Sequence, residues 1–95
     1  MKLVINTCYG GFGIKPEIVK EYGFDKRALL DYRYEKESRT DKKLIELIES
    51  GIDCNSECSE LAVVEIPDEA TDYYIEEYDG AENVLYVLDG KIHAL

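Results

Sequence analysis

The sequence predicts a small α+β domain in which two short helices pack on a mainly antiparallel sheet. Two observations support this prediction. The first half of the chain has apolar residues at helical spacing in two segments, and the second half has short apolar runs separated by Asp-Gly at 79–80 and 89–90. Asp-Gly between apolar runs is typical of a tight turn joining antiparallel strands. The chain of 95 residues suits a single domain over 1–95.

The N-terminal segment is expected to form a strand, a glycine-rich loop and a helix in that order. Lys2–Asn6 contains three consecutive apolar residues, which is typical of a strand covered on both faces. Pro16–Tyr22 begins with a proline, a residue that suits the first position of a helix. Gly23 follows directly and is expected to end this helix.

In the middle of the chain, the sequence predicts one secondary structure only for the second part. Residues 25–37 allow either an extension of the first helix or a short strand, followed by a charged loop. Lys42–Ser50 places its apolar residues on one face and its charged residues on the other, which predicts a second helix. Thr40 or Asp41 is expected to cap its start, and Gly51 to end it.

The last third of the chain is expected to form strands joined by tight turns. Pro67 ends the first of them, because proline cannot donate to a sheet ladder. The two Asp-Gly turns then make an antiparallel meander. The central positions of the fold are assigned to the two runs that are apolar throughout, 3–5 and 84–87. The expected strands are 61–66, 73–78, 83–88 and 91–94.

The glycine-rich loop is the only local signal of a ligand site. Glycines between a strand and a helix can gather backbone N–H groups around an anion, and flanking aromatic rings can stack on a base. The loop lacks the P-loop lysine and the dinucleotide-binding spacing, so the alternative is a strand-to-helix turn whose aromatic residues fill the core. The candidate ligand-binding residues are Tyr9, Gly10, Gly11, Phe12, Gly13 and Lys15.

The charge of the chain is strongly asymmetric. The net charge is −10; residues 1–43 hold ten basic and seven acidic residues, whereas residues 44–95 hold one basic and fourteen acidic residues. A field of this sign repels nucleic acid and anionic membranes and attracts basic protein surfaces. Solubility alone is the alternative explanation. We therefore expect a protein partner with a basic surface, and neither nucleic acid nor membrane as a direct partner; self-association stays open.

Tyrosines are interleaved with acidic residues in the part of the chain that holds most of the negative charge. Aromatic residues are enriched at protein interfaces, so this segment is the candidate partner-binding surface. The alternatives are a solvated sheet face with a charge-protected edge, or carboxylates that hold a hard cation. The candidate partner-binding residues are Tyr73, Tyr74, Glu76, Glu77, Tyr78 and Asp79.

The three cysteines indicate free thiols rather than a disulfide framework or a metal site. Cys54 and Cys58 are separated by three residues, which differs from common zinc and redox spacings. A zinc site made from all three cysteines and His93 is arithmetically allowed, as is a nucleophile and base pair of Cys8 with His93. We expect no enzyme activity and no cofactor. Without a membrane-spanning run or signal pattern, a cytoplasmic protein is expected.

Several segments resemble a family of small proteins encoded by tailed phages and prophages. These are the start of the chain through Cys8-Tyr9-Gly10-Gly11-Phe12-Gly13, the segment 64–68, the segment 74–80 and the start of the second helix at 39–41. Ile14-Lys15-Pro16 departs from the serine-like cap typical of the family, and 90–95 departs from its charged aromatic tail. The resemblance implies a mobile-element origin in a bacterial host cell and no particular activity. With the charge asymmetry, it suggests an accessory protein that binds a basic host or defence-system partner.

Overall fold

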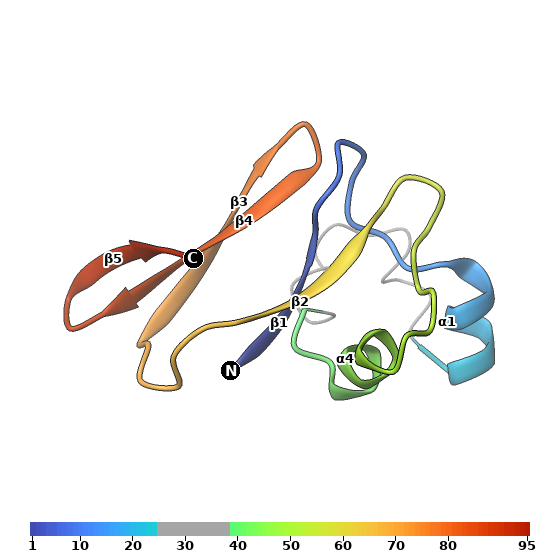
Figure 1. The fold of residues 1–95 in the computed structure, drawn as a ribbon, viewed down its shortest axis with the longest axis horizontal. Helices are drawn as coiled ribbons and strands as arrows, with labels where there is room; N and C mark the ends of the chain where they lie inside the picture. Colours follow the sequence, from blue (N-terminus) through green and yellow to red (C-terminus); the bar gives the residue numbers. More distant parts are fainter. Residues whose placement is uncertain (25–38) are drawn as a thin grey trace.

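Two helices and five strands are present in the computed structural model, which describes residues 1–24 and 39–95 (Figure 1). This arrangement confirms the α+β class. The interpretation of 25–37 lies outside the described residues. In chain order the elements are β1 (Lys2–Asn6), α1 (Pro16–Tyr22), α4 (Lys42–Glu49), β2 (Leu61–Glu65), β3 (Asp72–Tyr78), β4 (Ala81–Leu88) and β5 (Lys91–Ala94).

The strands are divided between two antiparallel sheets rather than forming one. The N-terminal sheet contains β1 and β2, and the C-terminal sheet has the order β3-β4-β5, which confirms the predicted meander. The division falls just after β2, where Pro67 has no backbone N–H to continue the ladder. The chain then crosses to begin the second sheet at Asp72 (Figure 1).

Strand β1 lies between two hydrophobic cores, as its three consecutive apolar residues predicted. Val4 packs with the helices in a cluster that includes Ile18 and Leu44. Leu3 and Ile5 point the other way and pack with Val84 of β4. The N-terminal sheet is therefore the middle layer, with helices on one side and the C-terminal sheet on the other (Figure 1). Both residue runs assigned to the centre of the fold contribute to this packing.

The helix boundaries follow the local sequence signals. The Asp41 side chain accepts a hydrogen bond from the Leu44 N–H, which makes Asp41, not Thr40, the cap of α4. Gly23 takes the left-handed conformation at the end of α1, with φ of 71°. Among the described residues, no helix is long and apolar enough to cross a membrane.

Both Asp-Gly dipeptides form the tight turns that the sequence predicted. In the first, Asp79 and Gly80 have φ of 50° and 90°; in the second, Asp89 and Gly90 have φ of 52° and 73°. Positive φ at both central residues is the mark of a two-residue hairpin turn whose twist matches that of the strands. The two turns set the register of the C-terminal sheet.

Candidate functional site

The glycine-rich loop is packed against two other backbone segments. A Cβ atom added at Gly10 would lie 1.9 Å from the Cys58 carbonyl oxygen. A Cβ atom added at Gly80 would lie 2.5 Å from the carbonyl carbon of Gly10. Distances this short leave no room for a side chain, so these glycines permit backbone-to-backbone contact. We call the meeting of the 7–13 loop, the 56–59 turn and the Asp79-Gly80 turn the loop junction.

Asn6, at the end of β1, is the polar centre of the loop junction. Its side chain is fully buried. The amide nitrogen donates to the carbonyl oxygens of Gly80, at 2.7 Å, and Cys8, at 2.9 Å. The amide oxygen accepts from the Glu60 N–H at 2.7 Å. One buried side chain thus bonds to the glycine-rich loop, to the Asp79-Gly80 turn 74 residues along the chain, and to Glu60, which directly follows the 56–59 turn.

A buried ion pair lies beside Asn6. Arg39 and Glu82 form a two-bond contact, with 2.6 Å between Nη2 and Oε2, and their side chains are 4% and 5% exposed. Glu82 also accepts from the Asn6 N–H at 2.7 Å, and the Arg39 guanidinium lies 3.8 Å from the centre of the Phe12 ring. This pair links the start of β4 to β1 and to the glycine-rich loop.

The predicted ligand-binding residues are divided between packing and surface positions. Gly10 and Phe12 pack within the junction, whereas Tyr9 is 79% exposed. Gly13 is held against the hydroxyl oxygen of Ser56, at 2.9 Å from an added Cβ, and Gly11 has open space around it. Lys15 lies 3.8 Å from the Asp53 carboxylate. The strand-turn-helix interpretation therefore accounts for the packed glycines, and ligand binding by this loop stays a prediction.

A shallow depression of about 510 Å³ lies next to the loop rather than within it. An isolated bridge between Ile14 and Asn55 separates the glycines from the start of α1. Lys15 precedes α1 without a side-chain cap. Of the predicted ligand-binding residues, Lys15 alone lines this depression, with Pro16, Glu17, Asn55, Ser56, Glu57 and Cys58.

The predicted partner-binding residues fall on both faces of β3. Tyr73 faces the core and packs beside the Leu3 cluster. Because side chains alternate along a strand, Tyr74, Glu76 and Tyr78 lie on the opposite face, and all three are exposed. Asp79 is exposed in the turn that follows. We call this exposed side of the C-terminal sheet the outer face.

Apolar residues of β4 and β5 also lie on the outer face, and they were not among the predicted partner-binding residues. The register places Tyr74 opposite Leu85, and Leu85 opposite Ala94, in one row across the sheet. Val87 and Ile92 form the next row. Tyr74 is 51% exposed and Ile92 is 68% exposed. The two Asp-Gly turns are the sequence signal from which the residues facing each other on neighbouring strands could have been predicted.

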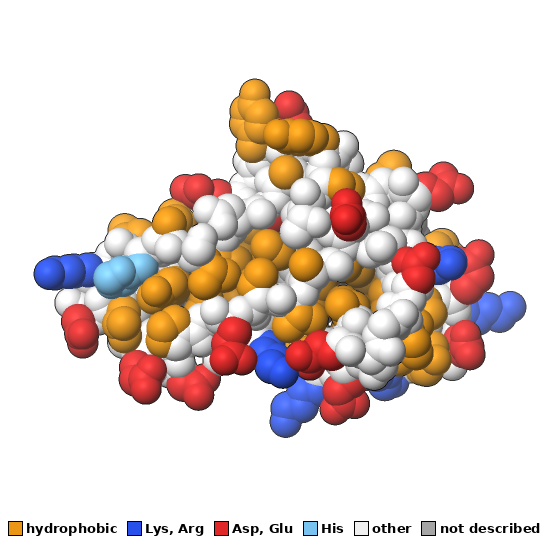
Figure 2. Space-filling model, viewed as in Figure 1, with side chains coloured by type: hydrophobic (Ala, Val, Ile, Leu, Met, Phe, Trp, Pro, Cys, Tyr) orange, Lys and Arg blue, Asp and Glu red, His pale blue; other side chains and the backbone are white. Residues whose placement is uncertain are grey.

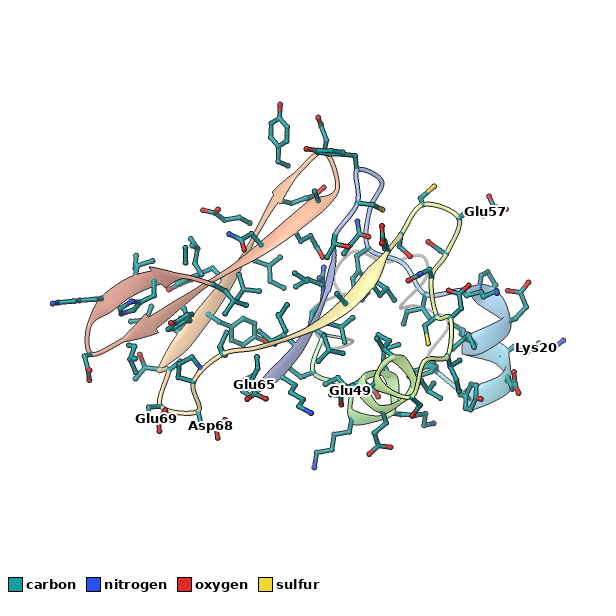
Figure 3. The ribbon with its side chains drawn as sticks, in the orientation of Figure 1. Lys20, Glu49, Glu57, Glu65, Asp68 and Glu69 are labelled. Atoms are coloured by element: carbon teal, nitrogen blue, oxygen red, sulfur yellow. The ribbon has the colours of Figure 1, made fainter. Side chains whose placement is uncertain are left out.

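Acidic groups surround the apolar rows. Asp72 and Glu76 lie on the outer face with Tyr74, and the Tyr74 hydroxyl donates to Asp72 at 3.1 Å. This hydrogen bond and the Asp72 charge raise the pKa of the Tyr74 hydroxyl. Glu65, Asp68 and Glu69 project where β2 leads into β3 (Figure 3). The outer face and its surroundings therefore combine apolar area with negative charge.

The loop junction brings the two predicted sites to one end of the molecule. Because Gly80 rests on Gly10, the turn that follows Tyr78 lies against the loop that carries Tyr9. Tyr9 and Tyr78 are 79% and 74% exposed. Hydrophobic side chains project from this end of the molecule (Figure 2).

The cysteines and His93 do not form a common site. Cys54 is buried among the helices, whereas His93 in β5 stacks on Tyr86 with 5.2 Å between ring centres. The described residues, which include all four candidate ligands, contain no group of three or more His, Cys, Asp or Glu placed to hold a metal ion. The zinc alternative is therefore wrong, because Cys54 and His93 lie in different layers of the fold. The pairing of Cys8 with His93 is also wrong, because Cys8 lies beside Cys58 in the loop junction, whereas His93 lies beside Tyr86 in the C-terminal sheet.

The contact between Gly80 and Gly10 makes a testable prediction about stability. Gly80→Ala and Gly90→Ala place the same side chain at the same turn position with similar positive φ, and only Gly80 has backbone atoms within reach of an added Cβ. We expect Gly90→Ala to cost about 1–2 kcal/mol from the strained φ. Gly80→Ala should cost about 1–3 kcal/mol more because of overpacking. Urea unfolding of both variants measures the difference, and equal losses would contradict the close contact.

A comparison of the chain with protein-family models, with curated proteins and with solved structures returned no match. The resemblance to phage-encoded proteins therefore stays a prediction.

Proposed function

We propose that this chain is a non-enzymatic protein-binding module whose outer face binds a basic partner. The observation that carries the proposal is the exposed cross-strand apolar area around Tyr74 and Ile92, with Asp72 and Glu76 on the same face. Contiguous exposed apolar area with a polar rim is typical of a protein interaction surface.

The charge distribution supports a basic partner over a second copy of this chain. Residues 44–95, which include the whole C-terminal sheet, carry a single basic residue, Lys91, against fourteen acidic ones. A second copy would bring the same negative field, and like charges facing each other disfavour association. A surface rich in Lys and Arg is attracted instead, and its encounter with the outer face is accelerated. The resemblance to phage-encoded proteins makes a host or defence-system protein the proposed partner.

The experiment combines capture of the partner with charge reversal on the outer face. Proteins captured from a bacterial lysate are purified, and the Kd of each is measured with the wild type and with Asp72→Lys/Glu76→Lys/Asp79→Lys. We expect the true partner to bind the triple variant at least about 10-fold more weakly, because several favourable charge contacts become repulsive. The wild-type affinity should also fall as salt is added.

A matched control separates local charge from net charge. Glu17→Lys/Glu21→Lys/Glu46→Lys changes the net charge equally but acts on α1 and α4, away from the C-terminal sheet (Figure 1). This control should keep most of the affinity. Tyr74→Ser/Ile92→Ser tests the apolar rows and should weaken binding without charge change. Binding that survives the outer-face variants, or that weakens equally in the control, would overturn the proposal.

A further inference from the structure

Cys8 and Cys58 are in contact although 50 positions separate them in the chain. The Cys8 thiol donates to the Cys58 carbonyl oxygen at 3.3 Å. A second contact also places the Cys58 backbone against the glycine-rich loop, since a Cβ added at Gly10 would lie 1.9 Å from that oxygen and 3.2 Å from the Cys58 Cα. The ladder between β1 and β2 continues toward this point, with the Thr7 N–H bonded to the Glu60 carbonyl.

We propose that Cys8 and Cys58 form a reversible intramolecular disulfide when the protein meets a small-molecule disulfide of the oxidised-glutathione class. The inference is independent of the proposed function. Cys58 is exposed and Cys8 is half-buried. Rotation of the exposed Cys58 side chain toward the Cys8 sulfur would bring the two Sγ atoms together, because Cys8 already points at the Cys58 backbone.

The exchange proceeds in two balanced steps. The exposed Cys58 thiolate attacks one sulfur of the small disulfide, whose S–S bond breaks, and one small thiol is released. The Cys8 thiolate then attacks the Cys58 sulfur of the mixed disulfide and releases the second small thiol. The two cysteines are oxidised, the small disulfide is reduced, and the two cysteine protons end on the two released thiols.

The hydrogen bonds that oxidation would break are weak, and the third cysteine is protected. Cys8 would give up hydrogen bonds from sulfur to the Cys58 carbonyl at 3.3 Å and to Asn6 Oδ1 at 3.4 Å, while Asn6 Oδ1 keeps its bond from the Glu60 N–H. Cys54 is 1% exposed. Burial, with the nearby Asp53 charge, raises the pKa of the Cys54 thiol, so little thiolate forms there.

The disulfide would stabilise the loop junction in a way that denaturation can measure. It would join the glycine-rich loop to the 56–59 turn and close a loop of about 50 residues in the unfolded chain. Cross-links of this kind lower the equilibrium constant for unfolding by roughly 30- to 1,000-fold. Oxidation would therefore strengthen the support on which the Gly80 turn rests.

The test uses the purified chain incubated with oxidised glutathione and compared with the reduced chain. We expect a mass loss of about 2 Da, as two thiol hydrogens leave. Cleavage after glutamate separates Cys54 from Cys58 at Glu57, so peptide mapping identifies the linked pair. Urea unfolding should show a higher midpoint for the oxidised chain, and a reducing agent should reverse it.

Two cysteine variants test which thiols form the disulfide. Cys54→Ser should still form the disulfide, whereas Cys58→Ser, at an exposed position, should abolish it. A linkage between Cys54 and Cys58, a mixed glutathione adduct as the sole product, or an unchanged unfolding midpoint would each overturn the inference.

Discussion

Replacement of Arg39 by methionine is expected to lower the free energy of unfolding by about 3–5 kcal/mol, because it leaves the Glu82 carboxylate buried without its counter-ion. Both side chains are at least 95% buried, and the two guanidinium nitrogens Nη1 and Nη2 contact the two carboxylate oxygens. The variant also loses the bond to the Val4 carbonyl at 3.2 Å. Small domains have about 5–15 kcal/mol of stability in total, so the loss is a large share. Urea unfolding followed by circular dichroism measures it.

Two controls identify burial of the pair as the cause. Lys2→Met breaks an ion pair of similar geometry, at 2.8 Å from Glu49, whose side chains are 45% and 43% exposed. Solvent screens that pair, so we expect little change in the free energy of unfolding. Adding Glu82→Leu to Arg39→Met removes the orphaned charge and should recover stability. An effect of Arg39→Met no larger than that of Lys2→Met would contradict the buried pair.

Asn6→Asp is expected to destabilise the protein by about 3–5 kcal/mol although it changes a single atom of the side chain. In the wild type the amide nitrogen donates to the carbonyl oxygens of Cys8 and Gly80. A carboxylate oxygen in its place cannot donate, and it would face these two oxygens in a fully buried site that already holds the Glu82 charge. The free energy of unfolding in urea at neutral pH is the measurement.

Asn83→Asp is the matched control for this prediction. It introduces the same chemical change in β4 at an exposed position, where water solvates the new charge. We therefore expect it to change stability little. If the two variants lost equal stability, the assignment of Asn6 as the link between the two sheets would be wrong.

The elements of the fold were predictable because their signals are local. The proline and glycine around 16–23, the apolar face of 42–49 and the two Asp-Gly turns each act within a few residues, and each element predicted within the described residues is present. The antiparallel meander followed from turn chemistry alone. The division into two sheets was not foreseen, since it depends on how β4 packs across β1 rather than on any single segment.

The sequence predicted only some residues of the candidate site, and the residues that it did not predict were missed for one physical reason. The exposed positions of Tyr74, Glu76 and Tyr78 agree with a partner-binding surface, while Tyr73 points to the core. The outer-face residues of β4 and β5 were missed, because membership of a face depends on register between strands. Nothing in the sequence distinguishes Glu82 from the other acidic residues of 44–95, and only its contact with Arg39 marks it as a buried structural charge.

The sequence by itself determined the helices, strands, turns and charge asymmetry, because these follow from backbone preferences and composition over short distances. The tertiary structure decided the packing of the glycine-rich loop. Its glycines permit Gly10 to contact both Cys58 and Gly80, and a contact between segments 48 and 70 positions away has no local signature. The tertiary structure also decided which charges are buried, since burial and pairing depend on neighbours that only the folded chain supplies.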